Sequence, residues 1–88
     1  MGKHEDLVAR ILRAEGLANI DFNELRGLLA FLGFTERIRG SHHVFSRAGV
    51  PELLNLQPRH RHAKVYQVRQ VRWVILRHGL HLRLLEDT

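Results

Sequence analysis

The chain has 88 residues, no cysteine and a formal net charge of +5. Its length fits a single domain (1–88), and the missing cysteines exclude disulfides, thiolate catalysis and cysteine-ligated metal sites. No apolar run approaches the roughly 20 residues of a membrane span, and the N-terminus lacks the apolar core of a secretory signal, so we expect a cytoplasmic protein with no membrane partner.

The positive charge is concentrated in the second half of the chain. Positions 37 to 77 hold nine basic residues and one acidic residue, Glu52, which gives this segment a net charge of +8. Twelve of the fourteen basic residues in the chain are arginines, whose guanidinium groups match phosphate oxygens and stack on bases. We therefore expect a nucleic-acid partner; an acidic protein partner and a solvated basic face are the alternatives.

Two amphipathic helices are predicted in the first third of the chain. The first covers 3–15 and ends at Gly16, and its apolar residues recur at helical spacing: Leu7, Val8, Ile11 and Leu12. Asp21 begins the second helix, because it stands three residues before Glu24 in an arrangement close to a capping box. The apolar face of this second helix consists of Leu25, Leu28, Leu29 and Leu32, and Gly33 is its C-terminal cap.

The spacing of apolar residues then changes to period two, which predicts three strands, over 34–39, 41–46 and 53–57. Gly40 forms the turn between the first two strands. Residues 47–51, which contain Gly49, connect the second strand to the third, and Pro58 stops the third strand.

A basic loop is expected over 59–64, before the last helix. That helix begins near Tyr66 or Gln67, and Gly79 is its cap. Trp73 lies off the apolar stripe of this helix, and we expect it to pack on the first helix or on the tail rather than to stack on a base. The sequence leaves open whether the tail (81–88) docks on the domain or extends to a partner.

The predicted order of helix, helix, strand, strand, strand, helix indicates an α+β domain. Three short antiparallel strands cover only one side of a core, so the helices are expected to pack together on one face of the sheet, in a two-layer fold. The other face is left open. We expect that open face to hold much of the polar and cationic chemistry.

Histidine is the residue type that suggests chemistry in this chain. Of the seven histidines, four lie in or beside the strand region: His42, His43, His60 and His62. Neighbouring residues of a strand point to opposite faces, so His42 and His43 do not act as a pair. Histidine ordinarily titrates near neutral pH, which suits it to move protons in RNA cleavage. A surface or packing role is the simpler alternative for a lone strand histidine.

Two further features bear on this chemistry. Glu52 is the only acid in the basic half of the chain, so paired carboxylates are not expected. We expect His43 to stand alone on an open sheet, with no obvious acid to orient it. A metal site formed by His60, His62 and one strand histidine is an alternative. The surrounding arginines would repel a divalent ion, so we expect no metal and no other cofactor.

Several segments, taken together, resemble the HicA toxins, also called the YcfA-like family. A leucine-rich helix ends in Leu32-Gly33-Phe34, and the middle strand holds Gly40-Ser41-His42-His43-Val44-Phe45. The third strand ends in Leu56-Gln57-Pro58-Arg59, and the last helix opens with Lys64-Val65-Tyr66-Gln67-Val68-Arg69-Gln70-Val71. The resemblance covers the core (20–80) and leaves out the helix over 3–15. The chain departs from the family pattern at 60–62, where its loop is bulkier and more basic than the loop of the family.

The resemblance implies a double-stranded-RNA-binding-domain-like fold and the toxin of a type II toxin–antitoxin system, with a role in stress response. Family members are ribosome-independent mRNA interferases, and the family's catalytic histidine maps onto His43. The expected inhibitor is a HicB-type antitoxin that covers the His43 face. We expect RNA to be held by Arg37, Arg39, Gly40, Ser41, His42, Arg59, Arg61, Lys64 and Tyr66.

Two functions other than an endoribonuclease are also consistent with the sequence. A non-catalytic RNA-binding module would use the same basic segment, and it would bind RNA in a salt-sensitive manner without cutting it. A metal-dependent hydrolase would use His60 and His62, and chelation would abolish its activity.

Overall fold

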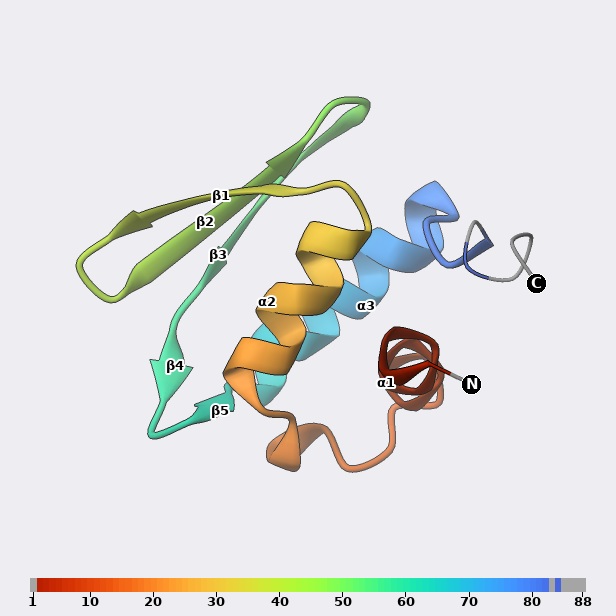
Figure 1. Cartoon of the computed structure of the whole chain (residues 1–88), viewed down its shortest axis with the longest axis horizontal. Coiled ribbons are helices and arrows are strands. Elements are labelled where there is room, and N and C mark those ends of the chain that lie inside the picture. Colours follow the sequence, from red (N-terminus) through yellow and green to blue (C-terminus); the bar gives the residue numbers. More distant parts are fainter. Residues whose placement is uncertain (1, 83, 85–88) are drawn as a thin grey trace.

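The computed structural model describes residues 2–82 and 84, and it confirms the α+β architecture and the element order (Figure 1). The helices are α1 (Lys3–Leu12), α2 (Phe22–Phe31) and α3 (Val65–His78), with one 3₁₀ turn at Leu17–Asn19. The strands are β1 (Thr35–Arg39), β2 (His42–Arg47) and β3 (Val50–Leu56), followed by the short strands β4 (Pro58–Arg59) and β5 (His62–Ala63).

The main sheet is antiparallel in the order β1-β2-β3. Glu36 pairs with Phe45, which in turn pairs with Leu54, and His43 lies between Ile38 and Leu56. Directly opposed residues point to the same face. Because Phe45, Leu54 and Leu56 are buried, this is the face against which α2 and α3 pack. The two-layer prediction is therefore confirmed, and His43 belongs to the helix-covered face.

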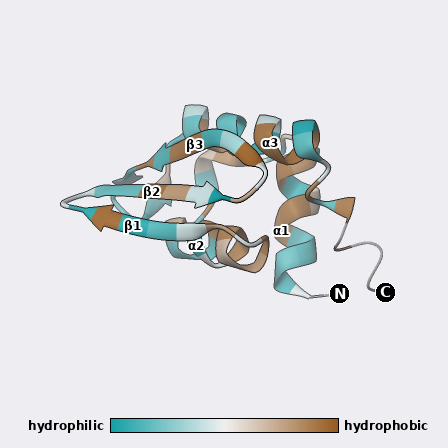
Figure 2. Cartoon of the chain, turned by 90° about the horizontal axis from the view of Figure 1, so that it is seen from above, coloured by the Kyte–Doolittle hydropathy of each residue, from teal (hydrophilic) through white to brown (hydrophobic). Residues whose placement is uncertain are grey.

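The helices form the second layer because each buries one apolar stripe. The Asp21 side chain caps α2 by accepting a hydrogen bond from the Glu24 amide at 3.0 Å. The apolar stripes of α2 and α3 are fully buried: Leu25, Leu28, Leu29, Val68, Val71 and Ile75. Helix α1 lies beyond α2 and α3 and clear of the three strands in both views (Figures 1 and 2). It is joined to α3 by a hydrogen bond from Arg72 Nε to the Leu12 carbonyl at 3.2 Å.

The prediction of a basic loop over 59–64 is wrong, because this segment is the small antiparallel β4–β5 hairpin. The chain reverses at His60, which has a left-handed backbone with φ of 54°. The hairpin is tied to the start of α2, since the Phe22 amide donates to the Arg61 carbonyl at 2.8 Å and the Ala63 amide donates to the Ile20 carbonyl at 2.9 Å. These long-range hydrogen bonds give order to a segment that looks like a loop in the sequence.

Other boundaries also differ from the prediction. Strand β3 begins at Val50 rather than at position 53. It accommodates Pro51 because it is an edge strand, where one missing amide donor disturbs no second ladder. The first helix ends at Leu12 and not at 15.

The sequence left open whether the C-terminal tail docks on the domain, and the structure answers this for the start of the tail. Leu80 and Leu84 are buried in the core, so the start of the tail docks on the domain, while Leu85 and the rest of the tail lie outside the described residues. The Trp73 side chain is 53% exposed, with the Arg77 guanidinium 5.2 Å from the ring centre, so the described residues do not bury it; packing on the last residues of the tail lies outside them. Among residues 2–82 and 84, no helix is long and apolar enough to span a membrane.

Candidate active site

His43 lies near the start of β2, and its side chain is only 12% exposed. The prediction that His42 and His43 point to opposite faces is confirmed by the strand register: His42 lies opposite Arg39 on the open face, and His43 lies opposite Ile38 on the helix-covered face. The expectation that His43 stands on an open sheet is therefore wrong. The ring packs edge-on against Phe22 of α2, with ring centres 4.9 Å apart.

The expectation that His43 has no orienting acid is also wrong. Glu36 of β1 lies diagonally across the β1–β2 ladder, and its Oε2 is 2.7 Å from His43 Nδ1. Arg26 of α2 holds this carboxylate with two hydrogen bonds, from Nε to Oε2 at 2.7 Å and from Nη2 to Oε1 at 3.1 Å. We call these three residues the Arg26–Glu36–His43 cluster.

The electrostatics of the cluster fix the direction of its hydrogen bonds. Hydrogen bonds from Arg26 lower the pKa of Glu36 below its ordinary value; burial opposes this shift, and the bond with His43 adds to it. The same pairing raises the pKa of Arg26. Glu36 is therefore an ionised acceptor, which requires His43 Nδ1 to carry the proton it donates. Nε2 is then the nitrogen left for a substrate, and within the described residues it has no hydrogen-bond partner.

A cavity of about 410 Å³ opens in front of the His43 ring. It lies between the start of α2, β2 and the β4–β5 hairpin (Figure 1), and we call it the His43 groove. Its lining residues are Asp21, Phe22, Asn23, Arg26, His43, Pro58, His60 and Arg61. Arg26 is already paired with Glu36, so Arg61 and His60 of the hairpin are the groove's candidates for contact with an anionic substrate.

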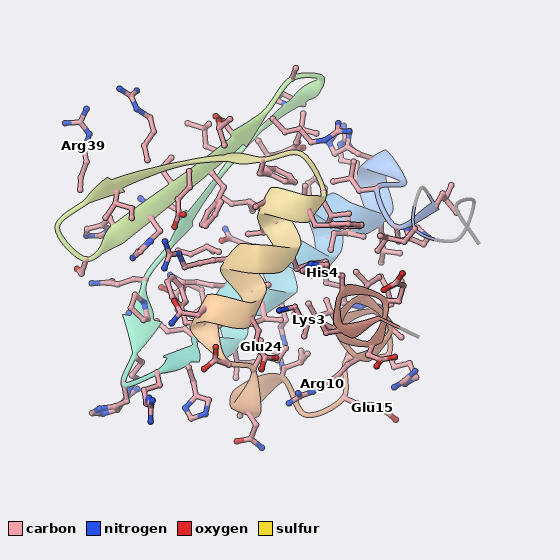
Figure 3. The ribbon with its side chains drawn as sticks, viewed as in Figure 1. Lys3, His4, Arg10, Glu15, Glu24 and Arg39 are labelled. Carbon is pink, nitrogen blue, oxygen red and sulfur yellow. The ribbon has the colours of Figure 1, made fainter. Side chains whose placement is uncertain are left out.

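The predicted RNA-binding residues divide among different surfaces. Arg61 lines the His43 groove, and the nearby Arg59 is an exposed residue of β4. Arg37 and Arg39 lie on the open face of the sheet with His42, and Figure 3 shows Arg39 projecting away from the helices. Because Arg39 and the groove lie on opposite faces, the structure does not bring them together.

The remaining predicted residues lie at the edges of the open face. Gly40 has φ of 60° in the β1–β2 turn, a conformation that favours glycine. Ser41 Oγ accepts a hydrogen bond from Gln57 Nε2 at 2.9 Å, and Lys64 Nζ donates to Gln57 Oε1 at 3.3 Å. Tyr66 lines a second hollow together with His42, which points to the face of the sheet opposite to that of His43.

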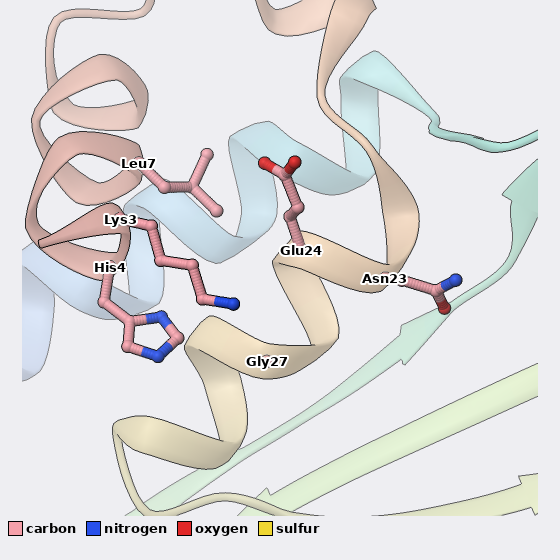
Figure 4. Close-up of a pocket in the computed structure, with 6 residues that line it drawn as sticks. All are labelled: Lys3, His4, Leu7, Asn23, Glu24 and Gly27. Carbon is pink, nitrogen blue, oxygen red and sulfur yellow. The ribbon is translucent and has the colours of Figure 1, made fainter.

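A third hollow, of about 190 Å³, lies between α1 and α2. Lys3 and Leu7 extend from α1 toward Glu24 and Gly27 of α2 (Figure 4). The only histidine there is His4, whose ring stacks on Phe31 with ring centres 4.6 Å apart. This hollow lacks the paired histidine and carboxylate that distinguish the His43 groove.

The metal-site alternative finds no support in the part of the chain that the structure describes. Over residues 2–82 and 84, no three side chains of histidine, cysteine, aspartate or glutamate are arranged to hold a metal ion. His60 lines the His43 groove, while His62 pairs with Arg59 in the hairpin ladder.

The cluster predicts a specific dependence of stability on pH. Because the pKa of Glu36 is lowered by folding, its stabilising contribution is complete above the ordinary pKa of about 4.5 and is lost as the pH falls through the lowered value. Glu36→Gln removes this titration, so its free energy of unfolding should fall less than that of the parent between pH 6 and pH 3. Urea unfolding at both pH values measures the difference. Equal losses in the two proteins would contradict this account of the cluster.

Comparison with known proteins adds nothing to this geometry, since no family model, no curated protein and no solved structure matches the chain.

Proposed function

We propose that this protein is a metal-independent endoribonuclease and the toxin of a type II toxin–antitoxin system, as the resemblance to the HicA toxins implies. The observation that carries this proposal is the His43 ring, held by Glu36 at 2.7 Å, with Nε2 unengaged at a groove that arginine and histidine side chains line. An orienting carboxylate fixes the tautomer and the direction of a histidine that acts as general base.

In this mechanism, His43 Nε2 accepts the proton of a ribose 2′-hydroxyl, and the 2′-oxygen attacks the adjacent phosphorus. The imidazolium that forms is stabilised by the Glu36 carboxylate, which Arg26 keeps ionised. The products are a 2′,3′-cyclic phosphate and a 5′-hydroxyl end. The proposed reaction needs no metal-activated water, because the nucleophile is supplied by the RNA itself and the two protons are moved by histidines.

The other side of the groove is proposed to protonate the leaving 5′-oxygen of the RNA. The 5′-oxygen leaves opposite the attacking 2′-oxygen, so one imidazole nitrogen is poorly placed to serve both atoms. We assign the leaving-group side to the β4–β5 hairpin, where His60 and Arg61 line the groove. His60 donates the proton to the 5′-oxygen, and Arg61 stabilises the charge on the phosphate oxygens.

The proposed cellular setting is the cytoplasm, with mRNA as the substrate and a HicB-type antitoxin as the inhibitor. The antitoxin would act by covering the His43 groove, which excludes RNA from the ring. The positive charge of the chain suits both partners, because RNA is an anion and an acidic surface on an inhibitor would match the same arginines.

The experiment that tests the function is incubation of the purified protein with end-labelled single-stranded RNA in excess EDTA, read on a sequencing gel. We expect cleavage products, with 5′-hydroxyl ends that polynucleotide kinase labels without prior phosphatase treatment. Binding without products would favour the non-catalytic RNA-binding module. Products that vanish only in EDTA would favour the metal-dependent hydrolase.

A further inference from the structure

A hollow of about 260 Å³ lies at the β3 edge of the sheet, where open-face residues of β2 and β3 meet the start of α3, and it shares no lining residue with the His43 groove. Its lining residues are His42, Leu53, Asn55, Gln57, Tyr66, Gln67 and Gln70, and we call it the Tyr66 hollow. Six of these seven side chains are able to donate or accept hydrogen bonds, and none of them is a carboxylate, a lysine or an arginine. Amides offer a donor and an acceptor side by side, which is the pattern that the edge of a nucleobase presents.

The aromatic member of the hollow is exposed and held in place. The Tyr66 side chain is 61% exposed, so most of its surface is accessible to a ligand. Gln67, only 4% exposed, donates from Nε2 to Tyr66 Oη and to the Asn55 carbonyl, each at 3.4 Å. Gln67 Oε1 also accepts a hydrogen bond from the backbone amide of Gln57 at 3.0 Å. These bonds tie the tyrosine to β3, and a fixed ring loses less freedom when a base stacks on it.

Cations adjoin the hollow on the same face of the sheet. In the strand register, Arg37 lies opposite Val44, which lies opposite Asn55, while Arg39 lies opposite His42. Arginines on β1 are therefore aligned across the sheet with the hydrogen-bonding side chains of β2 and β3. A single strand of nucleic acid laid across this face would have cations for its phosphates at one side and amides and an aromatic ring for a base at the other.

We propose that the Tyr66 hollow binds one unpaired base of a single-stranded RNA, with Tyr66 stacking on the base and the amides of Asn55 and Gln70 contacting its edge. Arg37 and Arg39 hold the neighbouring phosphates. RNA as the ligand rests on the proposed function. An acidic peptide fits less well, because the hollow itself contains no lysine or arginine to pair with its carboxylates.

The test measures binding without cleavage, in a His43→Ala background, by fluorescence anisotropy of labelled ten-nucleotide homopolymers at fixed salt. Tyr66→Ala should weaken binding about 5- to 150-fold, the loss expected for one stacked base, whereas Tyr66→Phe keeps the ring and should bind within about twofold of the background. Gln70→Ala should change the order of affinity among the homopolymers, because it alters contacts to the base edge. Circular dichroism of each variant confirms that it folds.

Trp73→Ala is the matched control, because Trp73 is a comparably exposed aromatic residue of α3 that does not line the hollow. It should leave the affinity unchanged. Three results would overturn the proposal: no RNA binding by the background protein, unchanged affinity in Tyr66→Ala, or an equal loss in Trp73→Ala. Displacement of RNA by a polyglutamate peptide that itself binds through Tyr66 would overturn the assignment to a nucleobase.

These outcomes are separable from those of the cleavage assay. RNA that binds through Tyr66 but is not cut by the parent protein would support the hollow and contradict the nuclease. RNA that is cut by the parent but binds equally well to Tyr66→Ala would support the nuclease and contradict the hollow.

Discussion

Replacing His43 with alanine should lower kcat/KM for RNA cleavage by about 10²- to 10⁴-fold, the range that a positioned acid–base group contributes. His43 is the only residue whose ring nitrogen is oriented by a carboxylate at the His43 groove, so no neighbour takes over its role within the described residues. The measurement is steady-state cleavage of a defined RNA in EDTA, accompanied by growth of cells that express the variant. Both cleavage and toxicity should be lost.

The fold supplies a close internal control for this substitution. His78 Nε2 is bonded to Glu52 Oε1 at 2.8 Å, and Arg77 Nε lies 3.3 Å from Glu52 Oε2, so this trio repeats the residue types of the Arg26–Glu36–His43 cluster at a different place. His78→Ala removes a similarly buried histidine, with a side chain 19% exposed, that does not line the groove. It should cleave RNA at the parent rate. A His43→Ala protein that is as active and as toxic as the parent would show that the proposed mechanism is wrong.

Replacing Glu36 with glutamine should lower kcat by roughly 10²- to 10³-fold while leaving KM almost unchanged. The ionised carboxylate accepts the Nδ1 proton of His43, whereas the amide of glutamine can instead donate to Nδ1 and place the histidine proton on Nε2. Reversal of the tautomer disables the general base, as it does when other carboxylate–histidine pairs are changed to an amide. Glu36 thus acts as a positioning residue through His43.

Two measurements separate positioning from a purely structural role. The ¹⁵N chemical shifts of the His43 ring should indicate a protonated Nδ1 in the parent and a protonated Nε2 in Glu36→Gln. Glu52→Gln, which alters the second histidine–glutamate pair, should leave both the His43 shifts and the cleavage rate unchanged. A Glu36→Gln protein with the parental tautomer and a parental kcat would eliminate the orienting role.

Under the proposed function, the two faces of the sheet have separate roles. The groove on the helix-covered face would hold the reacting phosphate at His43, and the open face would present arginines and the Tyr66 hollow to the rest of the RNA. Residues 42 and 43 are adjacent in sequence yet serve different surfaces, because successive side chains of a strand alternate. Substitutions on the open face should therefore affect binding and base preference more than the chemical step.

The sequence by itself determined the architecture. Apolar spacing of 3.6 located the helices, period two located the three main strands, and the order of these elements gave the α+β class. It also selected His43 as the candidate catalytic residue, placed it on the opposite face of the sheet from His42, and showed where the positive charge accumulates. These properties are local, since they depend on residues close together along the chain.

Only the tertiary structure decided what surrounds His43. Arg26, Glu36 and His43 come from a helix and two strands, and their convergence depends on the β1–β2 register and on how α2 crosses the sheet. A count of acids within the basic segment does not include Glu36, because this residue stands just before the segment begins. The tight turn at Gly40 does imply a register in which Glu36 lies diagonally across from His43, so the sequence contained a signal for this pair. The β4–β5 hairpin was missed because its order comes from hydrogen bonds to residues 20–22, about 40 positions earlier in the chain. Periodicity records which face a residue takes, but not which distant residues share that face.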